Sequence, residues 1–392
     1  MPEQGNGKGS PKQMKPVYFN NAAGTYPKPA CVLEAMQKNL TEPPVNPYRE
    51  NVTGLNVIDE CRKEVAGLFH YKNPQRVVLC SGATEALNMA VFGLIQKGGH
   101  VITTCMEHNA ILRPLYALRD RCEITLSVLP CDADCHIDPE QVGRAVRHNT
   151  CLIAINHASN VTGTIQPIDE IYAECERWEV PVIFDLSQSA GAADIDLSDK
   201  PLVVGVFTGH KALMGPPGTG GLLVGEDVNI PPIKFGGTGI HSELESMPDD
   251  FPSRLEPGTP NYPGIAGLCA GIRYIRSKGV KALAQHRMAL VRSLQETLEV
   301  DQACSCHAAP ADQNPCGVVS FCMENWNCED VGYVLNHSYD IRIRTGLHCA
   351  PLVHRYTGTW PDGTVRASFS CFNTADELSY FTNALNEIRG SA

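Results

Sequence analysis

A lysine at the end of an apolar run is the residue of this sequence whose setting most clearly allows covalent chemistry. Lys211 follows residues 203–208, Gly209 and His210, and a Gly/Pro-rich stretch at 215–221 comes after it. Burial lowers the pKa of an ammonium group, and a neutral amine is the form that condenses with an aldehyde. A lone lysine more often reaches solvent or closes an ion pair, so this interpretation needs further residues.

Other apolar runs also end in polar residues. His108 follows the run 101–104, Asn160 follows 151–156, and Asp185 and Gln188 follow 182–184. In a parallel α/β sheet the carboxyl ends of the strands share one edge, where ligands bind. We therefore expect these side chains to lie near Lys211. For Asp185 alone, a helix N-cap or a surface carboxylate is the ordinary alternative.

An anion site is predicted between the strand 76–80 and the helix that follows it. Ser81-Gly82-Ala83-Thr84 joins the two, and its small residues let backbone N–H groups approach a phosphate at the positive end of the helix. A plain N-capped helix would be the simpler explanation of Thr84 by itself. An amine, a carboxylate that keeps a pyridine nitrogen protonated, and a phosphate site together are what pyridoxal 5'-phosphate requires.

The elements that must position these residues indicate an α/β fold. Strands and helices alternate through a large, mainly parallel-sheet domain at 16–276, whose first residues can pack with a second domain. A long helical pattern at 280–298 leads into that smaller α+β domain at 277–392. Its predicted elements are strands at 317–322, 341–344 and 364–370 and helices at 328–336 and 375–388. Residues 1–15 are polar and glycine-rich and predict a disordered tail.

Composition narrows the possible functions. The net charge of -11 argues against nucleic-acid binding. No apolar run is long enough for a membrane helix, and the N-terminus lacks the apolar stretch of a signal peptide, so we expect a cytoplasmic protein. The seventeen cysteines include possible metal ligands at Cys131/Cys135/His136, Cys304/Cys306/His307 and Cys322/Cys328. None has paired C-x2-C spacing, so no metal site is predicted.

Seven motifs in order resemble those of the cysteine desulfurases. They are Ser-Gly-Ala-Thr-Glu-Ala, Glu-His-Asn-Ala, Ser-Asn-Val-Thr-Gly-Thr, Asp-Leu-Ser-Gln, Thr-Gly-His-Lys, Glu-Pro-Gly-Thr-Pro-Asn and Arg-Thr-Gly-Leu-His-Cys-Ala, between about residues 17 and 388. That family belongs to the class V aminotransferase-like, fold-type I enzymes that depend on pyridoxal phosphate. The resemblance implies a sulfurtransferase that converts L-cysteine to L-alanine.

The resemblance also implies roles for individual residues. Lys211 matches the lysine that bonds to the cofactor aldehyde, and His108 matches a catalytic histidine that stacks on its ring. Asp185 and Gln188 match contacts to the pyridine nitrogen and the phenolic oxygen, and Asn160 matches a residue beside the ring. The residues that match phosphate contacts are Ala83, Thr84, Thr208 and His210. Thr238 matches a threonine that reaches the phosphate in the neighbouring subunit, which implies a homodimer.

A second group of matches concerns the amino-acid substrate. Cys349 resembles the nucleophile that accepts sulfur as a persulfide, and Arg344 and His348 nearby favour its thiolate form. Arg366 matches the arginine that grips the substrate carboxylate, and Ala23 and Asn160 are the other expected substrate contacts. Many relatives have His-His-Cys where this chain has Leu347-His348-Cys349, so it is most similar to a branch with the Arg-Thr-Gly-Leu-His-Cys-Ala-Pro-Leu loop.

The predicted function is that of a cysteine desulfurase which passes sulfur to a reductant or to an acceptor protein. Selenocysteine lyase or cysteine-sulfinate desulfinase activity is the alternative on the same scaffold. A nucleotide-binding loop at 215–221 is not supported, because no Lys-Ser/Thr follows the last glycine. A non-enzymatic, cysteine-rich metal scaffold would instead show bound zinc or iron and no chromophore.

Overall fold

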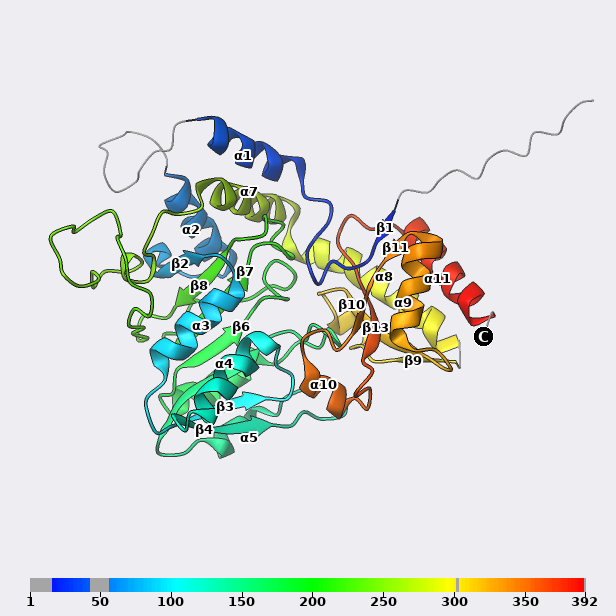
Figure 1. Cartoon of the computed structure of the whole chain (residues 1–392), viewed down its shortest axis with the longest axis horizontal. Coiled ribbons are helices and arrows are strands. Elements are labelled where there is room, and N and C mark those ends of the chain that lie inside the picture. Colours follow the sequence, from blue (N-terminus) through cyan, green and yellow to red (C-terminus); the bar gives the residue numbers. More distant parts are fainter. Residues whose placement is uncertain (1–15, 43–55, 301–302, 391–392) are drawn as a thin grey trace, which may run out of the picture.

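The computed structural model describes residues 16–42, 56–300 and 303–390. In these residues a larger and a smaller β-sheet lie side by side, each with its own helices (Figure 1). The predicted tail at 1–15 lies outside the described residues.

The larger sheet has seven strands in the order β2-β8-β7-β6-β5-β3-β4. They are β2 (Val77–Cys80), β3 (Gly99–Thr104), β4 (Ile124–Leu129), β5 (Thr150–Asn156), β6 (Val182–Asp185), β7 (Val203–Thr208) and β8 (Gly220–Val224). The strand β8 runs antiparallel to β2 and β7, and every other pair of neighbouring strands in this sheet is parallel. The carboxyl ends of β5, β6 and β7 therefore meet at one edge of the sheet, as the sequence predicts.

Helices cover both faces of this sheet, which explains why its central strands are apolar throughout. In β7, Val203 and Phe207 pack into a core with α2, α6 and α7, whereas Val204 and Val206 pack into a core with α3 and α4. The helices of this part are α1 (Ala30–Thr41), α2 (Val57–Leu68), α3 (Ala83–Leu94), α4 (Asn109–Asp120), α5 (Pro139–Ala145), α6 (Ile168–Arg177) and α7 (Tyr262–Lys278).

The smaller sheet is antiparallel, in the order β12-β13-β10-β9. Its strands and the helices around it are β9 (Cys304–Cys306), β10 (Val318–Met323), β12 (Arg344–Gly346), β13 (Thr364–Ser368), α8 (Val280–Val300), α9 (Cys328–Tyr339), α10 (Pro351–Tyr356) and α11 (Ala375–Arg389). The N-terminal strand β1 (Val17–Tyr18) pairs with β11 (Ile341–Arg342), and Phe19 packs in the same core as Phe381. The start of the described chain thus lies against C-terminal elements.

Several features differ from the sequence prediction, among them β9 and α10, which were not predicted. The single strand predicted at 341–344 is two strands, because β11 pairs with β1 whereas β12 pairs with β13. The edge strand β4 was not predicted at all, since only its two end residues are buried and its apolar pattern is weak. Three short 3-10 helices complete the described elements: η1 (Pro74–Arg76), η2 (Ser253–Leu255) and η3 (Ala311–Gln313).

The predicted boundary after residue 276 falls inside the last turn of α7, and the division into two domains stays a prediction. Among the described helices, none has the length and apolarity needed to cross a membrane.

Candidate active site

A cavity of about 370 Å³ opens where the carboxyl ends of β5, β6 and β7 meet the start of α3. Most of the predicted site residues line it: Ala23, Ala83, Thr84, His108, Asn160, Asp185, Gln188, Thr208, His210, Lys211 and Arg366. Cys349 and Thr238 do not line it. The fold thus brings residues from Ala23 to Arg366, far apart in the sequence, to the wall of one cavity.

The turn at 81–84 forms one end of the cavity. Gly82 has φ +148°, a backbone conformation that glycine accepts and other residues rarely adopt, and α3 begins at the next residue. The first N–H groups of a helix have no partner within the helix. Across the cavity end, the hydroxyl of Thr208 lies 3.0 Å from Nδ1 of His210. This arrangement of helix N-terminus and hydroxyl fits a phosphate.

Lys211 and Asp185 come from neighbouring strands. Asp185 is the last residue of β6, and Lys211 stands three positions after the end of β7. Burial lowers the pKa of Lys211 to about 8, so a substantial fraction of the amine is neutral near physiological pH. The carboxylate Oδ1 of Asp185 accepts a hydrogen bond from the backbone N–H of Ser187 at 2.9 Å. The cavity thus holds a nucleophilic amine and an oriented carboxylate.

His108 is the N-cap of α4, and its Nδ1 accepts a hydrogen bond from the N–H of Ala110 at 3.0 Å. Burial, together with the charge of Lys211, lowers the pKa of His108 to about 4. The imidazole is therefore neutral at physiological pH and carries its proton on Nε2. A neutral ring in this position suits stacking on a planar cofactor, and that role stays a prediction.

Asn160 and Gln188 connect the cavity wall to other segments. Nδ2 of Asn160 donates to the carbonyl of His348 at 2.7 Å, and Nε2 of Gln188 donates to the carbonyl of Ala22 at 3.1 Å. Oδ1 of Asn160 is buried and has no hydrogen-bond partner in the described part of the chain. A buried polar atom of this kind suggests that a bound molecule completes the site.

Arg366 on β13 brings a positive charge into the cavity from the smaller sheet. The residue is 1% exposed, and its guanidinium donates to the carbonyl of Asn160 at 2.8 Å and to Oδ1 of Asn20 at 3.2 Å. Burial, with Arg344 nearby, lowers the pKa of Arg366 to about 9, so it remains a cation. Its Nε has no partner, and no ion pair with a carboxylate is found for it among the described residues. An unpaired buried guanidinium is suited to a substrate carboxylate.

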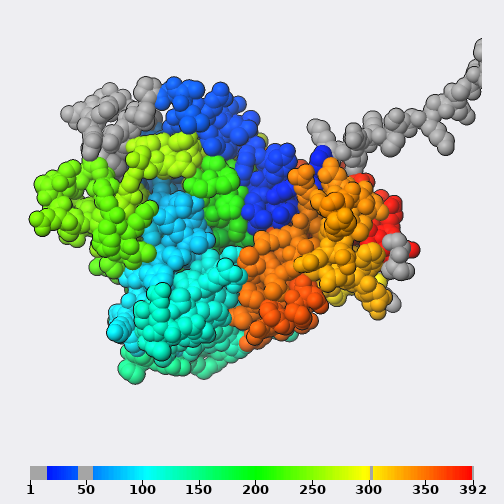
Figure 2. Space-filling view, in the orientation of Figure 1, coloured from blue at the N-terminus to red at the C-terminus, as the bar shows by residue number. Residues whose placement is uncertain are grey.

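Cys349 lies between β12 and α10, in a loop with an unusual backbone. His348 and Cys349 have φ +49° and +61°, a left-handed conformation that non-glycine residues rarely adopt. The Sγ of Cys349 accepts a hydrogen bond from Nη2 of Arg344 at 3.2 Å, and its carbonyl accepts one from the N–H of Asn109, next to His108, at 2.7 Å. The segment that includes α10 lies directly against the part of the molecule that contains the larger sheet (Figure 2). The thiol is thus held beside the wall of the cavity.

The prediction that His348 favours the thiolate form of Cys349 is wrong. Its ring is 2% exposed, and its Nε2 lies 3.0 Å from the hydroxyl of Thr364. Burial, with Arg366 nearby, lowers the pKa of His348 to about 2, so this imidazole carries no positive charge at physiological pH. Arg344 is the cation in contact with Cys349.

Thr238 belongs to the long segment between β8 and α7, which projects at one end of the molecule (Figure 1). Its hydroxyl donates to the carbonyl of Ile240 at 2.9 Å. Within the single chain it does not reach the cavity, and a contact with a neighbouring subunit stays a prediction.

Sequence reasoning missed several lining residues, among them Asn156, Ser187 and Arg344. Asn156 ends β5 and pairs in register with Asp185, so the strand-end argument could have found it. Its Oδ1 is buried without a partner in the described structure. Arg344 was noted only as a neighbour of Cys349. The described residues contain no group of three or more His, Cys, Asp or Glu able to hold a metal ion.

The comparisons with known proteins agree with this geometry. The family model "Aminotransferase class-V" matches residues 17–381, and the chain belongs to that family. Among its relatives it is 31% identical over 384 residues to the "Probable cysteine desulfurase" of Methanothermobacter thermautotrophicus, covering 95% of each chain. It is 32% identical over 342 residues to the "Cysteine desulfurase" of Enterobacter sp., covering 84% of this chain and 82% of that one.

A solved structure supports the same assignment. The apo structure of the cysteine desulfurase from Thermococcus onnurineus NA1 superposes with a TM-score of 0.85 at 29% identity, covering 96% of this chain and 95% of that one. The predicted membership of the class V, fold-type I group is therefore confirmed. The finer placement in the branch with the Leu-His-Cys loop stays a prediction.

Proposed function

We propose that this protein is a pyridoxal phosphate-dependent cysteine desulfurase, which converts L-cysteine to L-alanine and transfers the sulfur to Cys349. The observation that carries the proposal is that Lys211, Asp185 and Arg366 line one cavity, beside a cysteine that contacts Arg344. Arg366 is buried and has no ion pair with a carboxylate among the described residues. The relatives compared above bear the cysteine desulfurase name, so selenocysteine and cysteine sulfinate are not favoured as substrates.

The residues present fit the cofactor. Lys211 would hold its aldehyde carbon, Asp185 its pyridine nitrogen, and the 81–84 turn with Thr208 and His210 its phosphate. His108, Asn160 and Gln188 would contact its ring. When bound, pyridoxal phosphate supplies an electron sink that makes the α-hydrogen of the substrate acidic. Side chains of this chain carry out the proton transfer and the sulfur transfer.

Proton transfer falls to Lys211. With a pKa near 8, its Nζ can be a neutral amine and take up the α-proton of the substrate. Arg366 holds the substrate carboxylate and so directs the Cα–H bond toward that amine. Asp185 lines the same cavity and would hold the pyridine nitrogen of the cofactor.

Sulfur transfer falls to Cys349. Its sulfur, which Nη2 of Arg344 contacts, attacks the sulfur of the substrate as a thiolate, so that an S–S bond forms while the Cβ–S bond breaks. The carbon side gains protons and leaves as alanine, and the sulfur remains on Cys349 as a persulfide. A thiol reductant or an acceptor protein then removes it. Cys349 lies beside the cavity rather than in its lining, so the loop must bring Sγ inward for this step.

We also propose that the enzyme acts as a homodimer in which Thr238 contributes to the neighbouring site. It works in the cytoplasm, and its two domains are residues 16–276 and 277–392. Size measurement by light scattering tests the proposed homodimer.

The proposed function is tested by the absorption spectrum of the purified protein before and after addition of L-cysteine, with alanine and sulfide assayed. We expect a chromophore above about 400 nm, a spectral change with cysteine, and equal amounts of alanine and transferred sulfur. A colourless protein that cannot be reconstituted with pyridoxal phosphate would refute the proposal.

Arg366→Lys is expected to weaken substrate binding. Lysine keeps the charge but loses the two-pronged geometry, so KM for L-cysteine should rise by about 10- to 100-fold, with a smaller change in kcat. Steady-state sulfide production measures both constants. Arg342→Lys, on the exposed face of a nearby strand, is the matched control. An unchanged KM in Arg366→Lys would show that another residue binds the carboxylate.

The capture of pyridoxal phosphate by the apoprotein is expected to depend on pH through Lys211. Only the neutral amine attacks the aldehyde, and the pKa of Lys211 is lowered by burial to about 8. The rate of chromophore formation should therefore rise up to about pH 8 and level off above it. An ordinary lysine with its pKa near 10.5 would give a rate that still rises steeply above about pH 9, and that result would contradict the assignment.

A further inference from the structure

The outer edge of β2 is covered by two charged side chains instead of another strand. β2 is the terminal strand of the larger sheet, and β8 pairs with one side of it. On the other side, the carbonyl of Val77 accepts from Nε of Arg62 at 3.2 Å, and the N–H of Leu79 donates to Oε1 of Glu256 at 2.6 Å. Residues i and i+2 of a strand present these groups to the same edge, so Arg62 and Glu256 together replace a missing strand partner.

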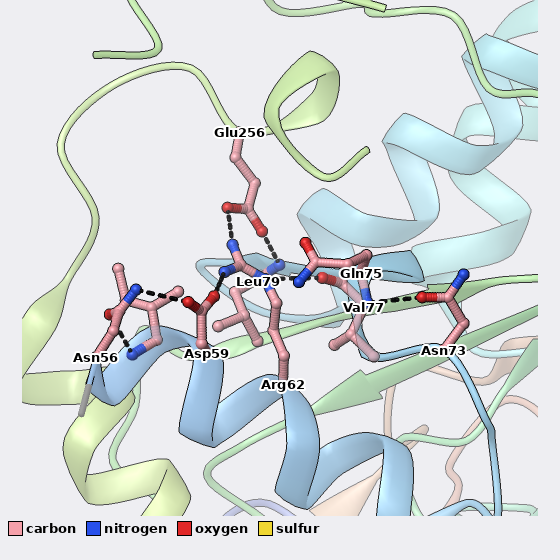
Figure 3. Close-up of polar contacts among 9 residues, drawn as sticks. Asn56, Asp59, Arg62, Asn73, Gln75, Val77, Leu79 and Glu256 are labelled. Carbon is pink, nitrogen blue, oxygen red and sulfur yellow. Dashed lines mark hydrogen bonds and ion pairs between the residues drawn. The ribbon is translucent and has the colours of Figure 1, made fainter. Parts of the chain in front are cut away.

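These two side chains also bind each other. Nη2 of Arg62 lies 2.5 Å from Oε2 of Glu256, and its Nη1 donates to Asp59 at 2.9 Å (Figure 3). The side chain of Arg62 is 1% exposed and that of Glu256 is 12% exposed. Burial raises the pKa of Glu256, and the charge of Arg62 opposes that rise. Removal of either partner of such a desolvated pair leaves the other charge buried without compensation, so a change in one side chain should disturb the strand edge that both cover.

The strand that this pair holds leads directly into the 81–84 turn. Leu79 is three residues before Gly82, and the turn has little room to move: a Cβ added to Gly220 on β8 would lie 2.6 Å from the Cα of Gly82. The position of β2 therefore determines where the turn and the N-terminus of α3 lie relative to the cavity.

The segment between β8 and α7 carries both Glu256, which binds Leu79 just before the turn, and Thr238. The N–H of Gly258 donates to the carbonyl of Gly237 at 2.8 Å, next to Thr238. A second link runs through Glu85, whose carboxylate accepts from Nζ of Lys234 at 3.2 Å and from the N–H of Ser81 at 2.9 Å. The segment between β8 and α7 is thus attached to the turn from both of its sides.

We propose that Arg62 and Glu256 are positioning residues for cofactor binding: through β2 they hold the 81–84 turn in the place where it receives the phosphate of pyridoxal phosphate. Neither residue lines the cavity, so neither is a catalytic residue. This inference rests on the proposed function. It implies that loss of the pair weakens recognition of the phosphate group and leaves recognition of the pyridine ring and aldehyde unchanged.

Glu256→Gln is the variant that tests this inference. Both carboxylate oxygens of Glu256 accept hydrogen bonds, one from Arg62 and one from the N–H of Leu79. A glutamine amide has only one oxygen, so whichever way it turns, its NH₂ group faces one of these two donors, and that donor loses its acceptor. The full-length apoprotein is titrated with pyridoxal phosphate and, separately, with pyridoxal, which lacks the phosphate. We expect Kd for pyridoxal phosphate to rise by about tenfold or more and Kd for pyridoxal to change by less than about twofold.

Two comparisons make the result decisive. Glu245→Gln, the same chemical change at an exposed position of the same segment, should bind both compounds as the unchanged protein does. If Glu256→Gln does not fold, as judged by circular dichroism, Glu256→Asp is measured instead, since its shorter carboxylate cannot reach both donors at once.

The outcomes separate this inference from the proposed function. Equal affinity of the variant and the unchanged protein for pyridoxal phosphate overturns the positioning role alone, and so does an equal loss of affinity for both compounds, which would indicate general structural damage. If the unchanged protein binds neither compound, the proposed function itself fails.

Discussion

Replacing Cys349 by alanine is expected to abolish sulfide release from L-cysteine while the cofactor remains bound. The cavity that would hold the cofactor does not include Cys349, so its loss leaves Lys211, Asp185 and the 81–84 turn unchanged. The S–S bond cannot form without the thiolate, and we expect the rate of sulfur transfer to fall by at least about 10³-fold. The measurement is sulfide and alanine production, together with the absorption spectrum.

The large number of cysteines makes a control necessary. Cys122→Ala removes an exposed thiol away from the cavity and should leave sulfur transfer unchanged. The position of Cys349 is the physical reason to expect the difference, because its Sγ contacts Arg344, which lines the cavity. Sulfide release by Cys349→Ala at the rate of the unchanged protein would remove Cys349 from the mechanism.

Lys211→Ala is expected to remove covalent attachment of pyridoxal phosphate altogether. Treatment of the unchanged protein with borohydride should fix the cofactor to one peptide, and the variant should yield no such peptide. Because the same amine is proposed to move the α-proton, activity should also fall by at least about 10³-fold. Mass spectrometry of the reduced, digested protein checks the attachment.

A second lysine provides the matched control. Burial lowers the pKa of Lys28 to about 8 as well, and its Nζ donates to the carbonyl of His210 at 2.7 Å. A lowered pKa therefore does not distinguish the two lysines, but only Lys211 lines the cavity. Lys28→Ala should still fix the cofactor at Lys211. A borohydride-stable adduct on Lys28 in the Lys211→Ala variant would move the attachment site.

The residues at the strand ends of the site were predictable because a buried parallel strand shows itself as a short, continuous apolar run, which local sequence reveals. Asp185 and Lys211 each follow a continuous apolar run, and consecutive runs joined by helices form a parallel sheet. Once the strands are parallel, their carboxyl ends lie together, and residues that follow them meet without further information. The roles of Arg366 and Cys349 were indicated by resemblance to a family, since nothing in their local pattern brings them to the larger sheet.

Other features depend on contacts between distant segments. His348 was expected to assist the thiolate, yet the packing around it removes its charge. The split of residues 341–346 into β11 and β12 depends on β1, more than 300 positions earlier in the chain. Glu256 opens the motif Glu-Pro-Gly-Thr-Pro-Asn, and its bond to Leu79 could not be predicted from the local pattern.

The amino-acid sequence by itself thus determined the alternation of strands and helices, the edge where the chemistry lies, and the amine, carboxylate and anion site that suit one cofactor, because each follows from local periodicity and residue type. Only the tertiary structure decided which polar groups keep their charge and which are left without partners. Burial and hydrogen bonding are properties of the packed chain. Among the residues that the structure describes, they leave Arg366 as a cation without a carboxylate partner, His348 as a neutral ring, and Arg62 with Glu256 as the cover of a strand edge.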